Sequence, residues 1–281
     1  MEEVRLHEGG RASAGSAHGE LPDCFAWQII TKRVLTVATV STDIDPFVHH
    51  PELHDKIRDP LTCWARNFKP SDLDERLAKL GAPPDWRYTD ARREQMRRET
   101  FRGLSVDDLW VFAYGSLMWD PGIQFVEVRK ARLAGYRRHF CLKDVYGARG
   151  TLQTPGLLAA LDRGDSCEGL VFRIPKKHVE EETEVLWRRE MPLPGYVAAF
   201  LDVETTPGNV NALVFVADHA AEKVIPDIRR SEQIQYISTA SGFAGSNLEY
   251  LENLVNQLTA LGIEDADLLA LLQDIRQVNL G

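Results

Sequence analysis

One carboxylate of this sequence, that of Glu190, stands where a helix is expected to bury an apolar side chain. The residues that precede it on the same helix face are Val179, Thr183 and Leu186. One further step of four residues along that face reaches Glu190. Pro192 biases Met191 away from helical geometry, so Glu190 falls in the last turn of the predicted helix.

That position is unfavourable for a negative charge, because the C-terminal end of a helix carries the negative end of its dipole. Burial would raise the pKa of the Glu190 carboxyl group further. An acid so placed is a candidate general base near neutral pH. The alternative interpretation is a structural ion pair between Glu190 and an arginine at the helix end, Arg188 or Arg189.

A second candidate for chemistry is the turn at Tyr114, Gly115 and Ser116, which follows the apolar residues of a predicted strand. Glycine lets a backbone approach a ligand closely, and successive N–H groups in a turn can form a small anion cradle. Ser116 adds a hydroxyl group, and Tyr114 adds an aromatic wall with a polar tip. The alternative is a strand that simply leads into a β-turn.

The common signatures of nucleotide-binding proteins, α/β-hydrolases and zinc proteases are missing from the sequence. His50 and His54 are four residues apart, but Pro51 lies between them and no further ligand is evident. Three further histidines, His139, His178 and His219, each stand alone in the sequence and suggest no metal site. We therefore expect no metal ion and no cofactor in the reaction.

Composition narrows the class of protein. The chain of 281 residues has 33 basic and 42 acidic side chains, and its formal charge of −9 argues against a nucleic-acid partner. No apolar run approaches the roughly 18–20 residues that a membrane-spanning helix needs. The first residues, Met-Glu-Glu, do not read as a secretory signal. The four cysteines (Cys24, Cys63, Cys141 and Cys167) are scattered, as expected for free thiols in a reducing cytoplasm.

Three regions differ in pattern. Residues 1–50 are expected to be a disordered or irregular extension, residues 51–105 a helical arm, and residues 106–281 the catalytic domain. In the arm, helices are predicted near residues 71–80 and 90–102, and the arginines of the second are expected to form a solvated face.

The third region alternates short apolar runs with turn residues. The predicted strands are 109–114, 125–133, 138–143, 157–162, 168–174, 196–203 and 210–217. Strands so closely spaced are mostly antiparallel. Helices are predicted over residues 176–191, from the capping box at Ser246 to Gly262, and from Asp265 onward. The fold class is therefore α+β, a sheet or barrel with helices.

Several segments of this region resemble the ChaC-type γ-glutamylcyclotransferases. Phe112–Trp119 resembles the substrate loop of that family, and the segment from Arg188 to Tyr196 resembles the one that holds its catalytic glutamate. Further matching segments follow the same order: Ala148–Thr151, Pro155–Gly156, Cys167–Gly169, Ala240–Gly242 and Gly245–Leu251. The resemblance runs from about Leu109 to Val278.

The resemblance implies a small mixed β-barrel flanked by helices, and cleavage of glutathione to 5-oxoproline and cysteinylglycine without a cofactor. It implies Glu190 as general base and acid. The substrate-binding residues that we predict are Tyr114, Gly115, Ser116, Leu117, Met118, Trp119, Arg149 and Tyr236. Two alternatives stay open: the substrate is another γ-glutamyl amine or peptide, or the chain is a non-catalytic module of the same fold.

Overall fold

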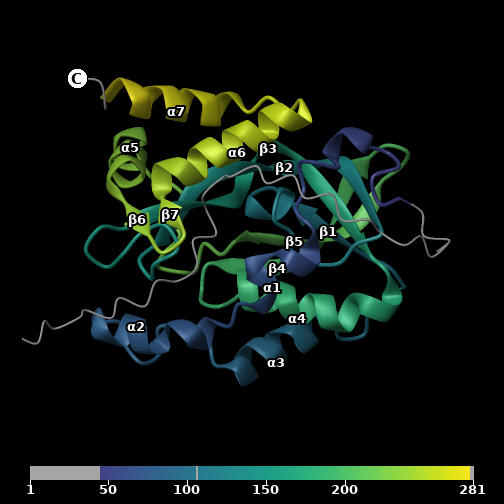
Figure 1. Cartoon of the computed structure of the whole chain (residues 1–281), viewed down its shortest axis with the longest axis horizontal. Helices are drawn as coiled ribbons and strands as arrows, with labels where there is room; N and C mark the ends of the chain where they lie inside the picture. Colours follow the sequence, from purple (N-terminus) through teal and green to yellow (C-terminus); the bar gives the residue numbers. More distant parts are fainter. Residues whose placement is uncertain (1–44, 106, 279–281) are drawn as a thin grey trace, which may run out of the picture. The chain divides into compact units, whose positions relative to one another are not determined.

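The structure is a computed structural model, and it describes residues 45–105 and 107–278. Five strands close into a barrel (Figure 1). The strands are β1 (Leu109–Ala113), β2 (Glu127–Asp144), β3 (Gly156–Ile174), β4 (Tyr196–Thr205) and β5 (Val210–Ala217). Their order is β1-β3-β2-β4-β5, and β5 closes the barrel by pairing in parallel with β1. The successive pairs along that order are antiparallel. The predicted α+β class with a small mixed barrel is confirmed.

The strands β2 and β3 are longer than the sequence predicts, because each joins two of the predicted strands. They pair along most of their length, with register shifts between Ala134 and Tyr136 and between Phe140 and Leu142. Gly135 takes a φ of +81° at the first shift, a conformation that glycine adopts without steric cost. A bulge of this kind bends a strand without ending it. The glycine therefore marks a bend inside β2 and not its end.

Alternate side chains of the barrel strands enter two apolar clusters, as the period of a β-strand requires. In β1, Leu109 and Val111 belong to the cluster that also includes residues of the covering helices. Phe112, with Tyr114 just after the strand, belongs to the second cluster. Figure 1 shows helices α6 (Asn247–Leu261) and α7 (Ala266–Val278) on one side of the barrel, and α4 (Val179–Glu190) on the other.

The helix ends follow their sequence signals. Ser246 Oγ accepts a hydrogen bond of 3.0 Å from the amide of Glu249 at the start of α6. Gly262 ends this helix with a φ of +69° in the left-handed region. Asp265 Oδ1 accepts a hydrogen bond of 3.2 Å from Leu268 N at the start of α7. Within residues 45–105 and 107–278, every helix is too short or too polar to cross a membrane.

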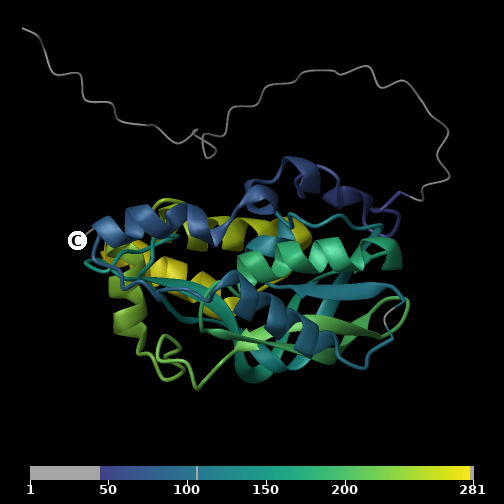
Figure 2. The same ribbon diagram turned by 90° about the horizontal axis from the view of Figure 1, so that it is seen from below.

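Residues 45–105 form an arm of short helices. Its elements are η1 (Pro51–Leu53), η2 (Pro60–Thr62), α1 (Trp64–Asn67), η3 (Pro70–Leu73), α2 (Asp74–Lys79) and α3 (Asp90–Phe101). Both α1 and α3 contact α4, and Figure 2 shows the purple and blue segments of the arm beside that helix. The expected irregular extension falls almost wholly on residues 1–44, which lie outside the described residues.

The prediction that the arginines of α3 form a solvated face is wrong for two of them. Arg93 and Arg97 are only 6% and 3% exposed. Arg97 Nη1 donates a hydrogen bond of 2.9 Å to Thr183 Oγ1, and its Nη2 pairs with Glu180 at 2.5 Å. The long apolar stem of an arginine can be buried when its charged end finds a partner. For Arg97 the partners are Thr183 and Glu180, in the first turns of α4.

The remaining elements of the fold are short. Helix α5 (Arg230–Thr239) precedes a two-stranded hairpin, β6 (Ser241–Gly242) and β7 (Gly245–Ser246). Two further single turns, η4 (Ser116–Met118) and η5 (Lys176–His178), follow β1 and β3 respectively. The turn η4 occupies the segment in which the sequence analysis places the candidate anion cradle.

Candidate active site

Glu190 ends α4, and its side chain is 15% exposed. The same helix buries Thr183 and Leu186, and Val179 packs against the core, so the predicted face of the helix is correct. Burial raises the pKa of the Glu190 carboxyl group, and the neighbouring charge of Arg189 opposes that rise. The structure thus contains both features that the sequence analysis weighed against each other, an inward carboxylate and an arginine that pairs with it.

Arg189 connects this carboxylate with the turn after β1. Its Nε lies 3.0 Å from Glu190 Oε1, and its Nη2 donates a hydrogen bond of 2.7 Å to Ser116 Oγ. Its Nη1 donates a hydrogen bond to the carbonyl oxygen of Asp120. One planar guanidinium therefore fixes the serine hydroxyl relative to the glutamate, because its donors have a rigid geometry. The Ser116 hydroxyl accepts in this bond and keeps its own proton for another acceptor.

The turn itself is held by backbone hydrogen bonds. Met118 N donates to Gly115 O at 2.9 Å, and Asp120 N donates to Ser116 O at 3.0 Å. Ser116 and Leu117 are the first residues of this turn, so their amides have no hydrogen-bond acceptor within the turn itself. The side chains of Leu117 and Met118 are buried in the core cluster. Of the predicted binding residues, these two can therefore present only backbone atoms to a ligand.

Three phenols lie close enough to Glu190 for its charge to act on them. They belong to Tyr114 after β1, Tyr196 in β4 and Tyr250 in α6, and the pKa of each is raised, first by burial and also by the charge of Glu190. The pKa of Tyr250 rises to about 12. Tyr196 Oη donates a hydrogen bond of 3.1 Å to the carbonyl oxygen of Ala159. All three phenols keep their protons at neutral pH and can serve as hydrogen-bond donors.

Gly115 brings the turn close to one of these phenols. A Cβ atom at this glycine would lie 3.4 Å from Tyr250 Oη. A methyl group there would fill the space between the turn and the phenol. Trp119, at the end of the turn, packs its ring 6.5 Å from that of Tyr250. The turn after β1 and the first part of α6 therefore form adjoining walls.

Arg149 lies on the other side of Tyr250. Its Cζ is 5.5 Å from the centre of the Tyr250 ring, and its Nη1 donates a hydrogen bond of 3.1 Å to Ser246 O. The same Nη1 lies 3.5 Å from Glu249 Oε2. Burial lowers the pKa of the Arg149 guanidinium. The predicted carboxylate-binding residue is thus a buried cation next to a phenol of the site.

Glycines and one asparagine fix the loop that carries Arg149. A Cβ atom at Gly156 would lie 2.5 Å from the carbonyl oxygen of Arg149, so any other residue would force the two backbone segments apart. The side-chain amide of Asn247 bonds both backbone groups of Leu157, at 2.6 Å and 2.7 Å. The Ala-Arg-Gly, Pro-Gly and Ser-Asn segments noted in the sequence therefore meet at one place.

Tyr236, the last of the predicted binding residues, lies on α5. It is partly buried against the core cluster, and Lys143 Nζ lies 5.8 Å from the centre of its ring. Among the described residues, no hydrogen bond joins Tyr236 to Glu190 or to the turn after β1. The structure brings together Glu190, the turn and the Arg149 loop, and it places Tyr236 in another environment.

The arm contributes contacts on both sides of the site that the sequence analysis did not foresee. Arg58 N donates a hydrogen bond of 2.9 Å to Trp119 O, and Tyr88 N donates one of 2.8 Å to Pro192 O. Cys63 is 1% exposed, and the pKa of its thiol is raised to about 12, first by burial and then by Asp120. No motif in the sequence signals these contacts, because they depend on which barrel loop each arm segment reaches.

The sequence suggests no role for Tyr196 and Tyr250, and for Arg189 it suggests only an ion pair with Glu190. Each lies inside a segment quoted for the family resemblance, so those segments were the available signal. A buried tyrosine next to a buried acid is recognisable only once the fold brings the two side chains together. Metal-ligand groups among the described residues lie elsewhere, at His139, Cys141 and Asp162.

The comparisons with known proteins agree with this fold. The model of the family described as ChaC-like protein matches residues 109–278 of the chain. A glutathione-specific gamma-glutamylcyclotransferase of Escherichia coli K12 is 36% identical over 171 residues, which cover 60% of this chain and 74% of the relative. One of the same name from Schizosaccharomyces pombe is 31% identical over 182 residues, covering 57% and 87%.

A crystal structure of a yeast gamma-glutamylcyclotransferase specific to glutathione superposes with a TM-score of 0.56 at 23% identity. The superposition covers 61% of this chain and 97% of the yeast chain, and it shows a shared fold. The family match covers more than half of the 281 residues and includes the turn after β1, Glu190 and α6. This chain belongs to the ChaC-like protein family.

Proposed function

We propose that this chain cleaves glutathione into 5-oxoproline and cysteinylglycine, as the names of its relatives suggest. The observation that carries the proposal is the chain of contacts from Ser116 through Arg189 to Glu190. It holds a carboxylate of raised pKa beside a turn in which the amides of Ser116 and Leu117 have no acceptor among the described residues. A carboxylate whose pKa is raised by burial is a stronger base than an exposed one, and it can both take up and release a proton during the reaction.

The reaction is an intramolecular aminolysis. Glu190 takes a proton from the α-ammonium group of the γ-glutamyl half, and the free amine attacks the γ-amide carbonyl carbon of the same molecule. The bond from that carbon to the cysteinyl nitrogen then breaks, and Glu190 returns a proton to the departing nitrogen. The attacking nitrogen loses its second proton in the same way, through Glu190, and the released cysteinylglycine takes it up as its N-terminal ammonium group. A five-membered lactam forms, and water is not consumed.

Positioning supplies a large share of the rate enhancement, because nucleophile and electrophile belong to one molecule. The chain has only to hold this substrate in its attack geometry, and a misplacement of about 1 Å can cost roughly 10²-fold in rate. We assign this role to the walls formed by the turn after β1, Tyr250 and Trp119. Arg149 is our candidate partner for a carboxylate of the substrate, since it is a buried cation beside Tyr250.

Charge also develops on the γ-carbonyl oxygen during the attack. The amides of Ser116 and Leu117 and the Ser116 hydroxyl are our candidates for donors to this oxygen. Removing one such donor from an enzyme typically costs about 2.7–4 kcal/mol of transition-state stabilisation. This mechanism uses only side chains and backbone groups of the chain. We place the reaction in the cytoplasm, where free thiols such as those of Cys63, Cys141 and Cys167 persist.

The test is a product assay with the purified full-length chain. Glutathione and a γ-glutamylamine without the cysteinylglycine half are supplied in parallel, and 5-oxoproline and the released amine are quantified by mass spectrometry. Equal amounts of 5-oxoproline and cysteinylglycine from glutathione support the proposal. Turnover of the γ-glutamylamine alone would assign the site to that alternative substrate class. Turnover of neither compound would leave a binding module of the same fold.

A further inference from the structure

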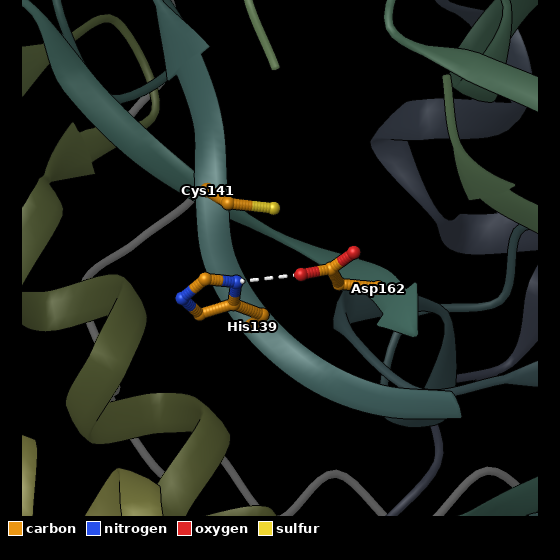
Figure 3. Close-up of side chains that lie close together, drawn as sticks. All are labelled: His139, Cys141 and Asp162. Atoms are coloured by element: carbon orange, nitrogen blue, oxygen red, sulfur yellow. Dashed lines mark hydrogen bonds and ion pairs between the residues drawn. The ribbon is translucent and has the colours of Figure 1, made fainter. Parts of the chain in front are cut away.

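A second cluster of reactive side chains lies apart from the catalytic residues, between β2 and β3. One ligand atom each from His139, Cys141 and Asp162 lie within 4.8 Å of one another. His139 Nδ1 is 3.1 Å from Asp162 Oδ2. Figure 3 shows the sulfur of Cys141, the imidazole nitrogen of His139 and the carboxylate of Asp162 turned toward a common space. Among the described residues, no hydrogen bond or ion pair joins this cluster to Glu190 or to the turn after β1.

The fold builds this cluster from a bulge. Strand β2 pairs with β3 so that His139 lies opposite Ala160, and the register then shifts between Phe140 and Leu142. Cys141 is the residue left without a partner across the strands at this shift. A bulge re-aims a side chain, and bulges are over-represented where a strand serves a function. Here the bulge belongs to the same short stretch of β2 as His139.

The candidate for a fourth ligand is His219 in the segment after β5, which contacts Asp162 but is not part of the set of atoms within 4.8 Å of one another. His219 Nε2 lies 2.8 Å from Asp162 Oδ1, so the carboxylate contacts an imidazole on each of its oxygens. Asp162 is only 5% exposed at its side chain, whereas that of His219 is 41% exposed. Three of the donors are therefore inside the protein, and the fourth faces solvent, where an ion would enter. The sequence analysis treated His139 and His219 as solitary residues.

Arg137 occupies part of this space and would oppose a cation. Its Nη2 lies 3.5 Å from Asp162 Oδ2 and 3.5 Å from His139 Nδ1. Both distances are at the outer limit of a hydrogen bond. The Arg137 side chain is 42% exposed, so its guanidinium can turn outward. Its Nε is buried and has no hydrogen-bond partner in the part of the chain that the structure describes. If Arg137 turned outward, it would therefore lose only these two weak contacts.

We propose that His139, Cys141, Asp162 and His219 bind a divalent transition-metal ion, for which zinc is the best chemical match. Two imidazoles, one thiolate and one carboxylate are donors that zinc accepts in four-coordinate sites. A thiolate and two imidazoles disfavour calcium and magnesium, which prefer oxygen ligands. The ion would join β2, β3 and the segment after β5. This role is structural, and it departs from the expectation that the chain holds no metal.

The test uses metal binding and needs no enzymatic readout. The full-length protein is purified, stripped with a chelator, and titrated with Co²⁺, whose thiolate complexes absorb in the near ultraviolet. We expect one equivalent of Co²⁺ to bind, with a thiolate-to-cobalt absorption band that Zn²⁺ removes by displacement. We also expect Zn²⁺ to raise the melting temperature in a concentration-dependent manner.

Variants assign the site. Cys141→Ser should abolish the absorption band and lower the affinity for Co²⁺ at least tenfold, and His219→Ala should lower that affinity without abolishing the band. The matched control is Cys167→Ser, because Cys167 is equally buried at 3% exposure but belongs to the other apolar cluster. The proposal is overturned if stripped protein binds no Co²⁺, or if Cys141→Ser and Cys167→Ser bind it alike. In that event the cluster is only a hydrogen-bonded network.

Discussion

Arg189 Nη2 donates a 2.7 Å hydrogen bond to Ser116 Oγ, across a separation of 73 residues in the sequence. The same guanidinium lies 3.0 Å from the carboxylate of Glu190. Two segments that look unrelated in the sequence, the turn after β1 and the end of α4, are thereby held in one geometry. Arg189 is a positioning residue in the mechanism proposed above, because it acts through Ser116 and Glu190.

Replacing Arg189 by glutamine tests this positioning role. The charge of Arg189 opposes the rise that burial causes in the pKa of Glu190, so removing it raises that pKa further. The general base must be deprotonated, and the acid limb of the profile of kcat/KM against pH should therefore move to higher pH. A hydrogen bond to a charged group is worth about 1.5–3 kcal/mol, so kcat/KM should fall roughly ten- to hundredfold at neutral pH.

The matched control is Lys177→Gln, which removes one positive charge from an exposed residue just before α4. Its pH profile should overlay that of the unmodified chain. An acid limb that stays in place in Arg189→Gln would show that the pair of Arg189 and Glu190 is merely structural.

Gly115→Ala probes the space between the turn and Tyr250. A Cβ atom there would lie 3.4 Å from Tyr250 Oη, so the methyl group takes volume that we assign to the substrate. We expect KM for glutathione to rise about tenfold or more, as a misplaced substrate loses its attack geometry. Gly208→Ala is the control, since a Cβ atom at Gly208 would meet nothing within 4 Å. Equal KM values for the two variants would place the substrate elsewhere.

Arg66→Met tests how firmly the arm is fixed to α4. Arg66 Nη1 pairs at 2.7 Å with Glu182, whose side chain is fully buried. Glu182 also accepts hydrogen bonds of 3.0 Å from the backbone and the side-chain amide of Gln124. Removal of one partner from a buried ion pair typically costs about 3–5 kcal/mol, because the other charge is left uncompensated. Urea unfolding should show a loss of that order.

The double variant Arg66→Met with Glu182→Gln should recover most of this loss, because it leaves no uncompensated charge. For comparison, Arg276→Met removes an exposed pair with Glu252, which is 2.9 Å long, and should cost at most about 1 kcal/mol. A loss in Arg66→Met no larger than that of Arg276→Met would contradict the buried-pair account.

The sequence allowed the site to be predicted where the signal was local. The interruption of an apolar helix face by Glu190, and the Tyr-Gly-Ser turn after an apolar strand, are both visible within a few residues. The barrel strands were found for the same reason, although the bend at Gly135 was taken for the end of a strand.

Contacts between distant segments could not be predicted in this way. Arg97 looked like a solvated residue because its partners, Thr183 and Glu180, are more than eighty residues away. The three phenols near Glu190 come from the turn after β1, from β4 and from α6, and their mutual proximity follows only from closure of the barrel. For Tyr236 the binding role stays a prediction: it lies on α5, where Lys143 Nζ is 5.8 Å from the centre of its ring.

Ionisation of Glu190 has opposite effects on the two properties: the proposed mechanism needs it, but it lowers the stability of the folded chain. Its carboxyl pKa is raised in the folded chain, so the unfolded chain loses this proton at lower pH than the folded chain does. Ionised Glu190 therefore costs stability once the pH passes its unfolded pKa, and the cost reaches its full size above the folded pKa. Glu190→Gln removes that cost, and it should leave the free energy of unfolding at neutral pH unchanged or raised.

The most direct measurement is the rate of 5-oxoproline formation from glutathione by Glu190→Gln, with urea unfolding of the same protein. General acid–base catalysis contributes about 10²–10⁴-fold, and we predict a loss of kcat in that range in a fully folded variant. Glu184→Gln, an exposed position on the same helix, should keep the original kcat. A Glu190→Gln protein that still forms 5-oxoproline at the original rate, or one that fails to fold, would contradict the assignment of Glu190 as the base.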